Sequence, residues 1–277
     1  MLTWVALLAL LGASQAFLLD SFRQEKWDAL KVTWNANPFA SNAFNSMPRT
    51  EADAQKQGFR KISECDTSAQ WRGRRYVKGD DYSVVLLFDV NGFIAGMQTS
   101  FADNQPSGFP KVNLQPPFVK DGDRFTISAY FVDPSTICTT GRTAADFASQ
   151  GTGINLYLQK TADPEASVLI PHQESGIGAT KWTEGKCFYT MGKHYWYDLS
   201  EDMNCDDYFP VFLLYNNGEL TAFGWALLTD LSSQRYEHPG QDVYKLFMKT
   251  PPKCIFNAGT ISTMHIYLTS NVALDVC

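Results

Sequence analysis

The sequence lacks the short motifs that most directly identify an enzyme. It contains no Cys-x-x-Cys pair, no His-Glu-x-x-His, no Gly-x-Ser-x-Gly elbow, and no phosphate loop or dinucleotide fingerprint. These absences remove the sequence support for zinc ribbons, thioredoxin-type redox chemistry, elbow-type hydrolases and nucleotide enzymes. Asn-x-Ser/Thr is absent as well, so N-glycosylation is not expected.

Positive charge and long apolar runs are also scarce. The chain has 23 Lys and Arg against 29 Asp and Glu, a net charge of −6. Nucleic acid is therefore not expected as a partner, because phosphate binding needs a basic surface. The apolar run at residues 5–11 is too short to cross a bilayer, and we expect no membrane span elsewhere. Small residues follow it up to Ala16, which predicts a signal peptide at 1–16 and a secreted, extracellular protein.

What the chain does contain is a sequence that occurs twice. Residues 80–92 read DDYSVVLLFDVNG and residues 206–218 read DDYFPVFLLYNNG, identical at seven of thirteen positions. Residues 49–58 (RTEADAQKQG) and 142–151 (RTAADFASQG) agree at six of ten positions. Around these segments a cysteine, a basic-aromatic pair, a Pro-Pro pair and a Thr-Ile-Ser segment recur in the same order. The order predicts an internal duplication.

The boundaries of the predicted repeat follow from these matches. Repeat unit 1 covers residues 49–138 and repeat unit 2 covers residues 142–277. Unit 2 carries insertions at 152–186, where residues 154–159 predict an extra strand, and at 229–245. Function often resides in such loops.

Residues 17–48 precede the repeat. Their periodic apolar side chains, including Phe22, Trp27, Leu30 and Trp34, predict an N-terminal helical segment that docks on the core.

The repeat also predicts how the six cysteines pair. An even number of cysteines behind a signal peptide favours disulfides, and two cysteines in each unit hold equivalent places in the duplication. The remaining two are additional to unit 2. The predicted disulfides are Cys65–Cys138, Cys187–Cys277 and Cys205–Cys254.

Local signals in each unit predict both a helix and a sheet. Thr50 and Thr143 are placed as helix N-caps, with an acid in the first turn and a glycine at the end. The repeated apolar runs close on Asn-Gly, which favours a tight hairpin with positive φ at both central residues. The predicted fold class is therefore α+β: two tandem pseudosymmetric repeats, each a helix packed on an antiparallel β-sheet and stapled by disulfides.

Two basic-aromatic pairs are candidate binding residues. Arg75-Tyr76 in unit 1 and His194-Tyr195 in unit 2 hold equivalent places, and Trp196 follows the second pair. Aromatic side chains stack on ligands or enclose apolar ones, so these residues are candidates for lining a cleft. The alternative is that they fill the core of a sheet protein.

His238 adds a candidate chemical group in the second insertion. It lies beside Glu237, and if it met His194 in space the two imidazoles would suit acid-base chemistry or a transition metal such as copper or zinc. The alternative, which we favour, is a pair of hydrogen-bonded surface histidines.

The duplicated acidic pairs are candidate cation ligands. Asp80-Asp81 and Asp206-Asp207 open the repeated strands, and calcium prefers carboxylate oxygens. No EF-hand spacing is present, however, and an acidic strand entry that keeps a sheet edge soluble explains the same residues. We favour this second interpretation.

Together these observations favour a secreted binding or interaction protein. It would hold a small molecule or an extracellular protein partner between the two duplicated units. The alternative is a secreted enzyme, perhaps metal-assisted, with its site in unit 2, because unit 2 carries the insertions and the additional disulfide. A structural matrix component is the third possibility, and the compact repeats make it less attractive.

Overall fold

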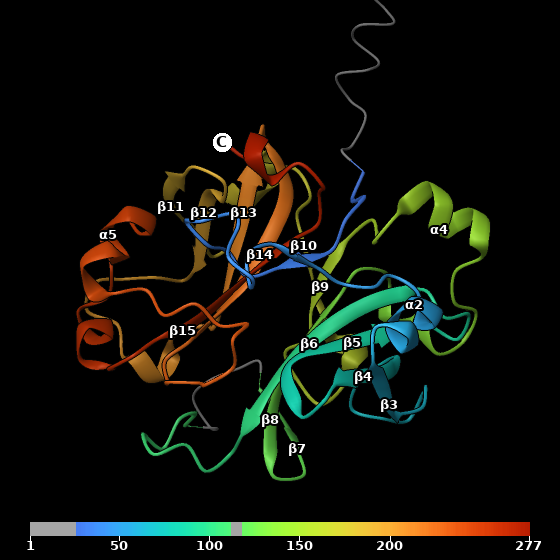
Figure 1. The fold of residues 1–277 in the computed structure, drawn as a ribbon. Helices are drawn as coiled ribbons and strands as arrows, with labels where there is room; N and C mark the ends of the chain where they lie inside the picture. The colour runs from blue at the N-terminus through green and yellow to red at the C-terminus, as the bar shows by residue number, and fades with distance from the viewer. Residues whose placement is uncertain (1–25, 112–117) are drawn as a thin grey trace, which may run out of the picture.

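The protein is mostly β-sheet. The structure is a computed structural model that describes residues 26–111 and 118–277, and the predicted signal peptide lies outside these residues. Two antiparallel sheets, which we name the N-terminal and C-terminal sheets, make up the described part of the chain (Figure 1). In spatial order the N-terminal sheet contains β10 (Val168–Ile170), β9 (Leu156–Leu158), β8 (Arg124–Tyr130), β6 (Ile94–Ala102), β5 (Asp81–Phe88), β4 (Arg74–Lys78) and β3 (Phe59–Ser63), with β7 (Val119–Asp121) paired to β8.

The C-terminal sheet carries most of the second half of the chain. In spatial order it contains β11 (Trp182–Phe188), β12 (Gly192–Tyr197), β13 (Val211–Asn216), β14 (Glu219–Leu227), β15 (Ser262–Tyr267), β1 (Lys31–Val32) and β2 (Asn45–Ser46). The strand order β3-β4-β5-β6-β8 in one sheet matches β11-β12-β13-β14-β15 in the other, with neighbouring strands antiparallel throughout.

The predicted helix-on-sheet repeat is wrong. Helices α2 (Glu51–Lys56) and α4 (Ala144–Gln150) form where expected, capped by Thr50 and Thr143. They are too short to cover a sheet, since α2 buries only Ala54 and α4 buries no residue. The sheets instead share one apolar core, in which Phe131 after β8 and Phe223 of β14 have ring centroids 6.2 Å apart.

The remaining helical segments are short, with three to six residues each. They are α3 (Pro134–Ile137), α5 (Tyr244–Phe247) and the 3₁₀ turns η1 (Pro164–Ala166), η2 (Glu174–Ala179), η3 (Cys205–Asp207), η4 (Gln241–Val243), η5 (Lys253–Asn257) and η6 (Val272–Leu274). Across the described residues, no helix is long and apolar enough to cross a membrane.

The three predicted disulfides are confirmed. Cys65–Cys138, Cys187–Cys277 and Cys205–Cys254 have Cα–Cα distances of 5.2, 6.1 and 5.7 Å, all within the normal range for a disulfide.

The two Asn-Gly turns differ from each other. Asn217 and Gly218 have φ of 50° and 80°, as a two-residue hairpin turn with two left-handed residues requires. In the first hairpin only the glycine, Gly92, adopts positive φ. There the Asp89 carboxylate accepts from the backbone N–H of Asn91 and of Phe93, at 2.9 and 3.0 Å, and these bonds stabilise a longer loop.

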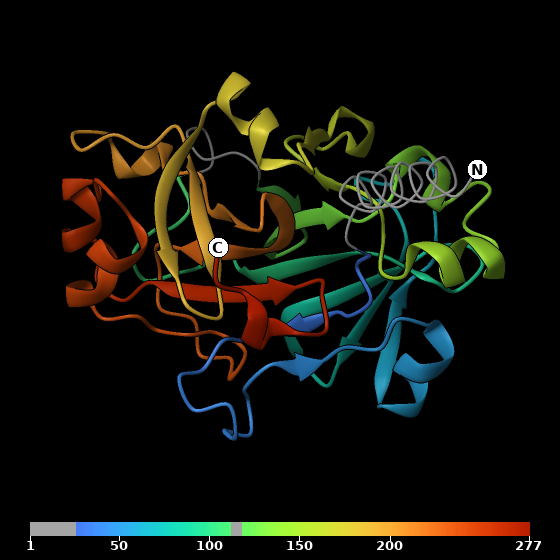
Figure 2. The same ribbon diagram turned by 90° about the horizontal axis from the view of Figure 1, so that it is seen from above.

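The N-terminal segment is extended where a helix was predicted. Of that segment, residues 17–25 lie outside the described part. Trp27 and Leu30 are buried as expected, but β1 pairs with β15 through Lys31 and Val32, and Figure 2 shows this blue strand beside the red one. The edge of β15 provides backbone hydrogen-bonding groups for this segment. The apolar periodicity of the segment carries no information about such a distant partner. The extra strand predicted at 154–159 forms as β9.

Candidate functional site

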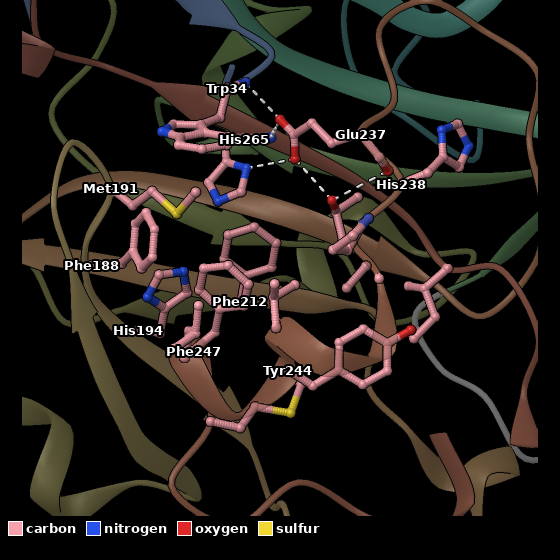
Figure 3. Close-up of a pocket in the computed structure, with 18 of the residues that line it drawn as sticks. Trp34, Phe188, Met191, His194, Phe212, Glu237, His238, Tyr244, Phe247 and His265 are labelled. Carbon is pink, nitrogen blue, oxygen red and sulfur yellow. Dashed lines mark hydrogen bonds and ion pairs between the residues drawn. The ribbon is translucent and has the colours of Figure 1, made fainter. Parts of the chain in front are cut away.

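A cavity of about 530 Å³ lies on the C-terminal sheet (Figure 3). Its walls come from β11–β15, from the segment between β14 and β15 that includes α5, and from the N-terminal segment around Trp34. The lining is dominated by aromatic side chains: Trp34, Phe188, Trp196, Tyr208, Phe212, Tyr236, Tyr244 and Phe247.

The floor of the cavity is one row of residues across neighbouring strands. Trp196 pairs with Phe212, Phe212 with Gly224, and Gly224 with His265. Gly224 has no side chain in this row, and a Cβ there would lie 2.1 Å from Cζ of Phe212. The missing side chain lets the Phe212 ring lie across β14 with its centroid 4.9 Å from that of His265.

One wall of the cavity is built around α5. A Cβ on Gly185 of β11 would lie 2.4 Å from the carbonyl oxygen of Phe247, so this glycine permits the close approach of α5. The Phe247 ring then lies 5.2 Å from both Phe188 and His194, measured between ring centroids.

The most distinctive polar feature of the cavity is a Glu237–His265 pair. Oε2 of Glu237 accepts from Nδ1 of His265 at 2.7 Å and from the Thr263 hydroxyl at 2.8 Å. Oε1 accepts from the backbone N–H of Trp34 and of His265, at 2.6 and 3.1 Å. The carboxylate therefore has four donors, which is close to its full acceptor capacity.

Glu237 is held ionised by these neighbours. Burial alone raises the pKa of this carboxyl, but the His265 imidazole and the hydrogen bonds from His265, Trp34 and Thr263 lower it more, so the pKa lies below its ordinary value. Its side chain is only 13% exposed. The site therefore contains a buried negative charge whose hydrogen bonds are satisfied by the protein.

Two backbone contacts place Glu237 over β15. Glu237 and Thr263 form an isolated antiparallel bridge, with N···O distances of 2.8 and 2.9 Å. On the other side, Thr33 adopts a φ of 72°, an uncommon conformation for a β-branched residue. The Thr33 hydroxyl donates to the Arg235 carbonyl at 2.8 Å, and the next N–H, that of Trp34, reaches Glu237. Strain at Thr33 is therefore localised at the site.

The two histidines predicted from the sequence behave differently. His194 lines the cavity and is 1% exposed, and burial followed by the nearby His265 lowers its pKa to about 3, so it is neutral. His238 lines the rim, but its Nε2 lies 3.0 Å from the Leu231 carbonyl, and its ring is turned away from the cavity (Figure 3). The residue that faces His194 is His265, with ring centroids 6.2 Å apart.

Of the candidate aromatic residues, Trp196 lines the cavity and its neighbour does not. Successive strand side chains point to opposite faces, so Tyr195 lies on the other face and donates to Glu174 at 2.6 Å.

The equivalent pair of unit 1 lies in β4, outside the lining of the cavity. Arg75 is bound to Gln98 at 2.8 Å and to Asp121 at 2.6 Å. Tyr76 donates its hydroxyl hydrogen to Glu51.

The acidic pairs lie apart from this cavity lining. Asp80 pairs with Arg60 at 3.2 Å, and Asp81 accepts from the hydroxyls of Ser83 and Ser233. In the second pair, Asp206 lies 3.2 Å from Lys111, and Asp207 belongs to the same 3₁₀ turn, η3. Within residues 26–111 and 118–277, no group of three or more His, Cys, Asp or Glu side chains could hold a metal ion.

The sequence interpretation missed His265. The signal that would have found it is the alternation in β15, where Thr263, His265 and Tyr267 alternate with Met264 and Ile266. Such alternation places three polar side chains on one face of the strand.

Comparison with known proteins finds no matching family model, curated protein sequence or solved structure.

Proposed function

We propose that the protein is a secreted, extracellular binding protein that holds a small, mostly apolar molecule in this cavity. The observation that carries the proposal is the cavity: about 530 Å³, walled by aromatic side chains, with the Glu237–His265 pair at one side. Small-molecule sites are commonly concave, of this size, largely apolar and equipped with a few polar groups that fix orientation.

Secretion is supported by two independent features. The apolar run and small residues up to Ala16 fit a signal peptide, and all six cysteines form disulfides, which persist in oxidising compartments.

The duplication of units 49–138 and 142–277 is part of the proposal. It is supported by the matching order of five strands in each sheet and by a disulfide in the equivalent place of each unit. The cavity is lined by residues of the N-terminal segment and of unit 2. The proposed ligand site therefore lies within the elaborated copy, and not in a groove between the copies.

Binding of N-phenyl-1-naphthylamine, an uncharged dye that fluoresces in apolar surroundings, tests the proposal. We expect one dye molecule per chain, and we expect Val243→Trp to abolish binding because Val243 is half-buried in the cavity wall. The matched control is Val276→Trp, at a position that is 53% exposed, and it should bind as the unaltered chain does. No dye binding, or equal binding by both variants, would refute the proposal.

The Glu237–His265 pair supports one second candidate, an enzyme. An imidazole oriented by a carboxylate at Nδ1 and bare at Nε2 has the arrangement of a general base. The test is hydrolysis of 2-naphthyl acetate, an ester of a size that suits the cavity. Turnover above the uncatalysed rate that is lost in His265→Phe, while dye binding persists, would favour the enzyme; no turnover would reject this base for ester hydrolysis.

A further inference from the structure

One atom of the cavity has no partner in the described protein. Nε2 of His265 is buried and lacks a hydrogen bond, and the whole residue is only 6% exposed. In Figure 3 the second ring nitrogen of His265 lies on the side away from Glu237. Buried polar atoms are nearly always paired, so an unpaired one in a cavity wall indicates a group that a ligand would satisfy.

The hydrogen bond at Nδ1 of His265 determines whether Nε2 can donate or accept a hydrogen bond. The Glu237 carboxylate can only accept, so Nδ1 of His265 carries the hydrogen of the 2.7 Å bond. In a neutral imidazole Nε2 is then a bare acceptor. The geometry therefore favours a ligand that donates one hydrogen bond.

The charged side chains around the cavity limit the chemical class of the ligand further. Among the described lining residues Glu237 is the only acidic side chain, and no Lys or Arg lines the cavity. A carboxylate ligand would meet a like charge without a counter-ion in an apolar site, where charges interact strongly. An ammonium has three N–H groups, and the single acceptor at Nε2 would leave the others unpaired.

We propose that the ligand is an uncharged apolar molecule carrying a hydroxyl group, of the alcohol or phenol class, whose O–H donates to Nε2 of His265. This inference rests on the proposed binding function. The hydroxyl has one donor to match one acceptor, and the Phe212 ring, 4.9 Å from that of His265 between centroids, provides an apolar face for the adjoining part of the molecule.

The experiment compares ligands of one size that differ only in this group. 2-Naphthol, 2-methoxynaphthalene and 2-naphthoate compete with N-phenyl-1-naphthylamine for the protein at neutral pH. We expect 2-naphthol to bind about 10-fold tighter than the methyl ether, which has the oxygen without the donor, as the gain of one hydrogen bond predicts. We expect 2-naphthoate to bind more weakly than the ether.

Two variants test whether His265 is the source of the preference for 2-naphthol. His265→Phe should bind 2-naphthol and the methyl ether equally. The matched control, His172→Phe, removes an imidazole that is also unpartnered but stacks on Trp27 outside the cavity lining, and it should keep the preference. If His265→Phe does not fold, the ligand series on the unaltered chain decides alone.

The outcomes separate the inference from the proposal on which it rests. Absence of dye binding overturns both. Dye binding without any preference for 2-naphthol over the ether overturns the hydroxyl inference and leaves the binding function standing.

Discussion

At the scale of single residues, the site depends on a buried charge that the fold fully satisfies. Taking a carboxylate out of water is costly, and it is tolerated only where donors replace the lost water. Glu237 receives such donors from Thr263 and His265 of β15 and from Trp34 of the N-terminal segment. Its neighbourhood is therefore both a wall of the cavity and a structural junction.

Replacing the charge tests this dual role. In Glu237→Gln the amide NH₂ replaces one acceptor oxygen and opposes an existing donor, so we expect the free energy of unfolding to fall by about 3 kcal/mol. Urea titration measures the loss. The control is Glu184→Gln on β11, where the side chain is 47% exposed and pairs with Lys249 at 2.9 Å; it should change stability by less than about 0.5 kcal/mol. Equal effects in the two variants would contradict the role given to Glu237.

The buried His194 predicts how stability depends on pH. Its pKa is about 3 in the folded chain, against an ordinary value of 6.5. Between these two pKa values the unfolded chain binds more protons at this residue than the folded chain does. The free energy of unfolding should therefore fall as the pH drops below about 6.5, with a slope of at most about 1.4 kcal/mol per pH unit. The lowered pKa of Glu237 acts in the same direction once the pH falls below its ordinary value of 4.5.

Urea titrations from pH 7 to pH 5 measure that slope. In His194→Phe the dependence should become shallower. Phe101→Leu, in the core of the N-terminal sheet, loses packing without removing a titrating group and should retain the original slope. An unchanged slope in His194→Phe would show that this imidazole does not carry the effect.

The residue scale also shows why the sequence offered His238, and not His265, as a candidate companion of His194. His238 adjoins Glu237 in the chain, so proximity in sequence suggested a shared site. In an extended chain adjacent side chains point to opposite sides, and Glu237 instead meets His265, 28 residues further along. That contact depends on the bridge between Glu237 and Thr263, which no local pattern encodes.

At the scale of elements, the cavity floor depends on the absence of a side chain in β14. In Gly224→Ala the new Cβ would lie 2.1 Å from Cζ of Phe212 and 2.5 Å from the Met264 carbonyl oxygen. We expect a loss of about 2 kcal/mol from overpacking and weaker binding of N-phenyl-1-naphthylamine, because the Phe212 ring must move into the cavity.

Thermal or urea unfolding and dye titration check this expectation. Gly178→Ala is the control, because a Cβ there meets nothing within 4 Å and its φ is not positive; it should leave both measurements unchanged. Adding Phe212→Leu to Gly224→Ala should recover part of the stability. Wild-type stability and dye affinity in Gly224→Ala would contradict the proposed geometry of the floor.

The elements that the sequence predicted are those with local causes. The caps at Thr50 and Thr143 and the turn at Asn217-Gly218 depend on hydrogen bonds and φ values within a few residues. Residues 26–34 are extended because the edge of β15 lies beside them, and Val32 pairs with Ile266, 234 residues further along the chain. Their apolar pattern correctly indicated burial of Trp27, but it could not distinguish a docked strand from a docked helix.

At the scale of the whole molecule, the two sheets are joined by more than their shared core. The hydroxyl of Thr99 in β6 lies 2.5 Å from that of Tyr236, and the hydroxyl of Ser83 in β5 lies 2.9 Å from that of Ser233. Tyr236 and Ser233 both belong to the segment between β14 and β15. The fold class was misjudged at this scale. A short helix with a cap and a terminal glycine can be predicted from neighbouring residues. The packing of one sheet against another cannot, because it depends on contacts between strands that are distant in the sequence.

This shared core predicts that the chain unfolds as one cooperative unit. Phe131 is fully buried between the sheets and packs against Phe223, so Phe131→Ala should cost about 3–5 kcal/mol. Amide hydrogen exchange should then show an equal loss of protection in β5 and in β13, although only the N-terminal sheet has been altered. Phe39→Ala, at a side chain that is 94% exposed, should leave both strands protected. A loss confined to β5 would instead mean that each sheet unfolds by itself, and the cavity on the C-terminal sheet would then not depend on the packing of the other half.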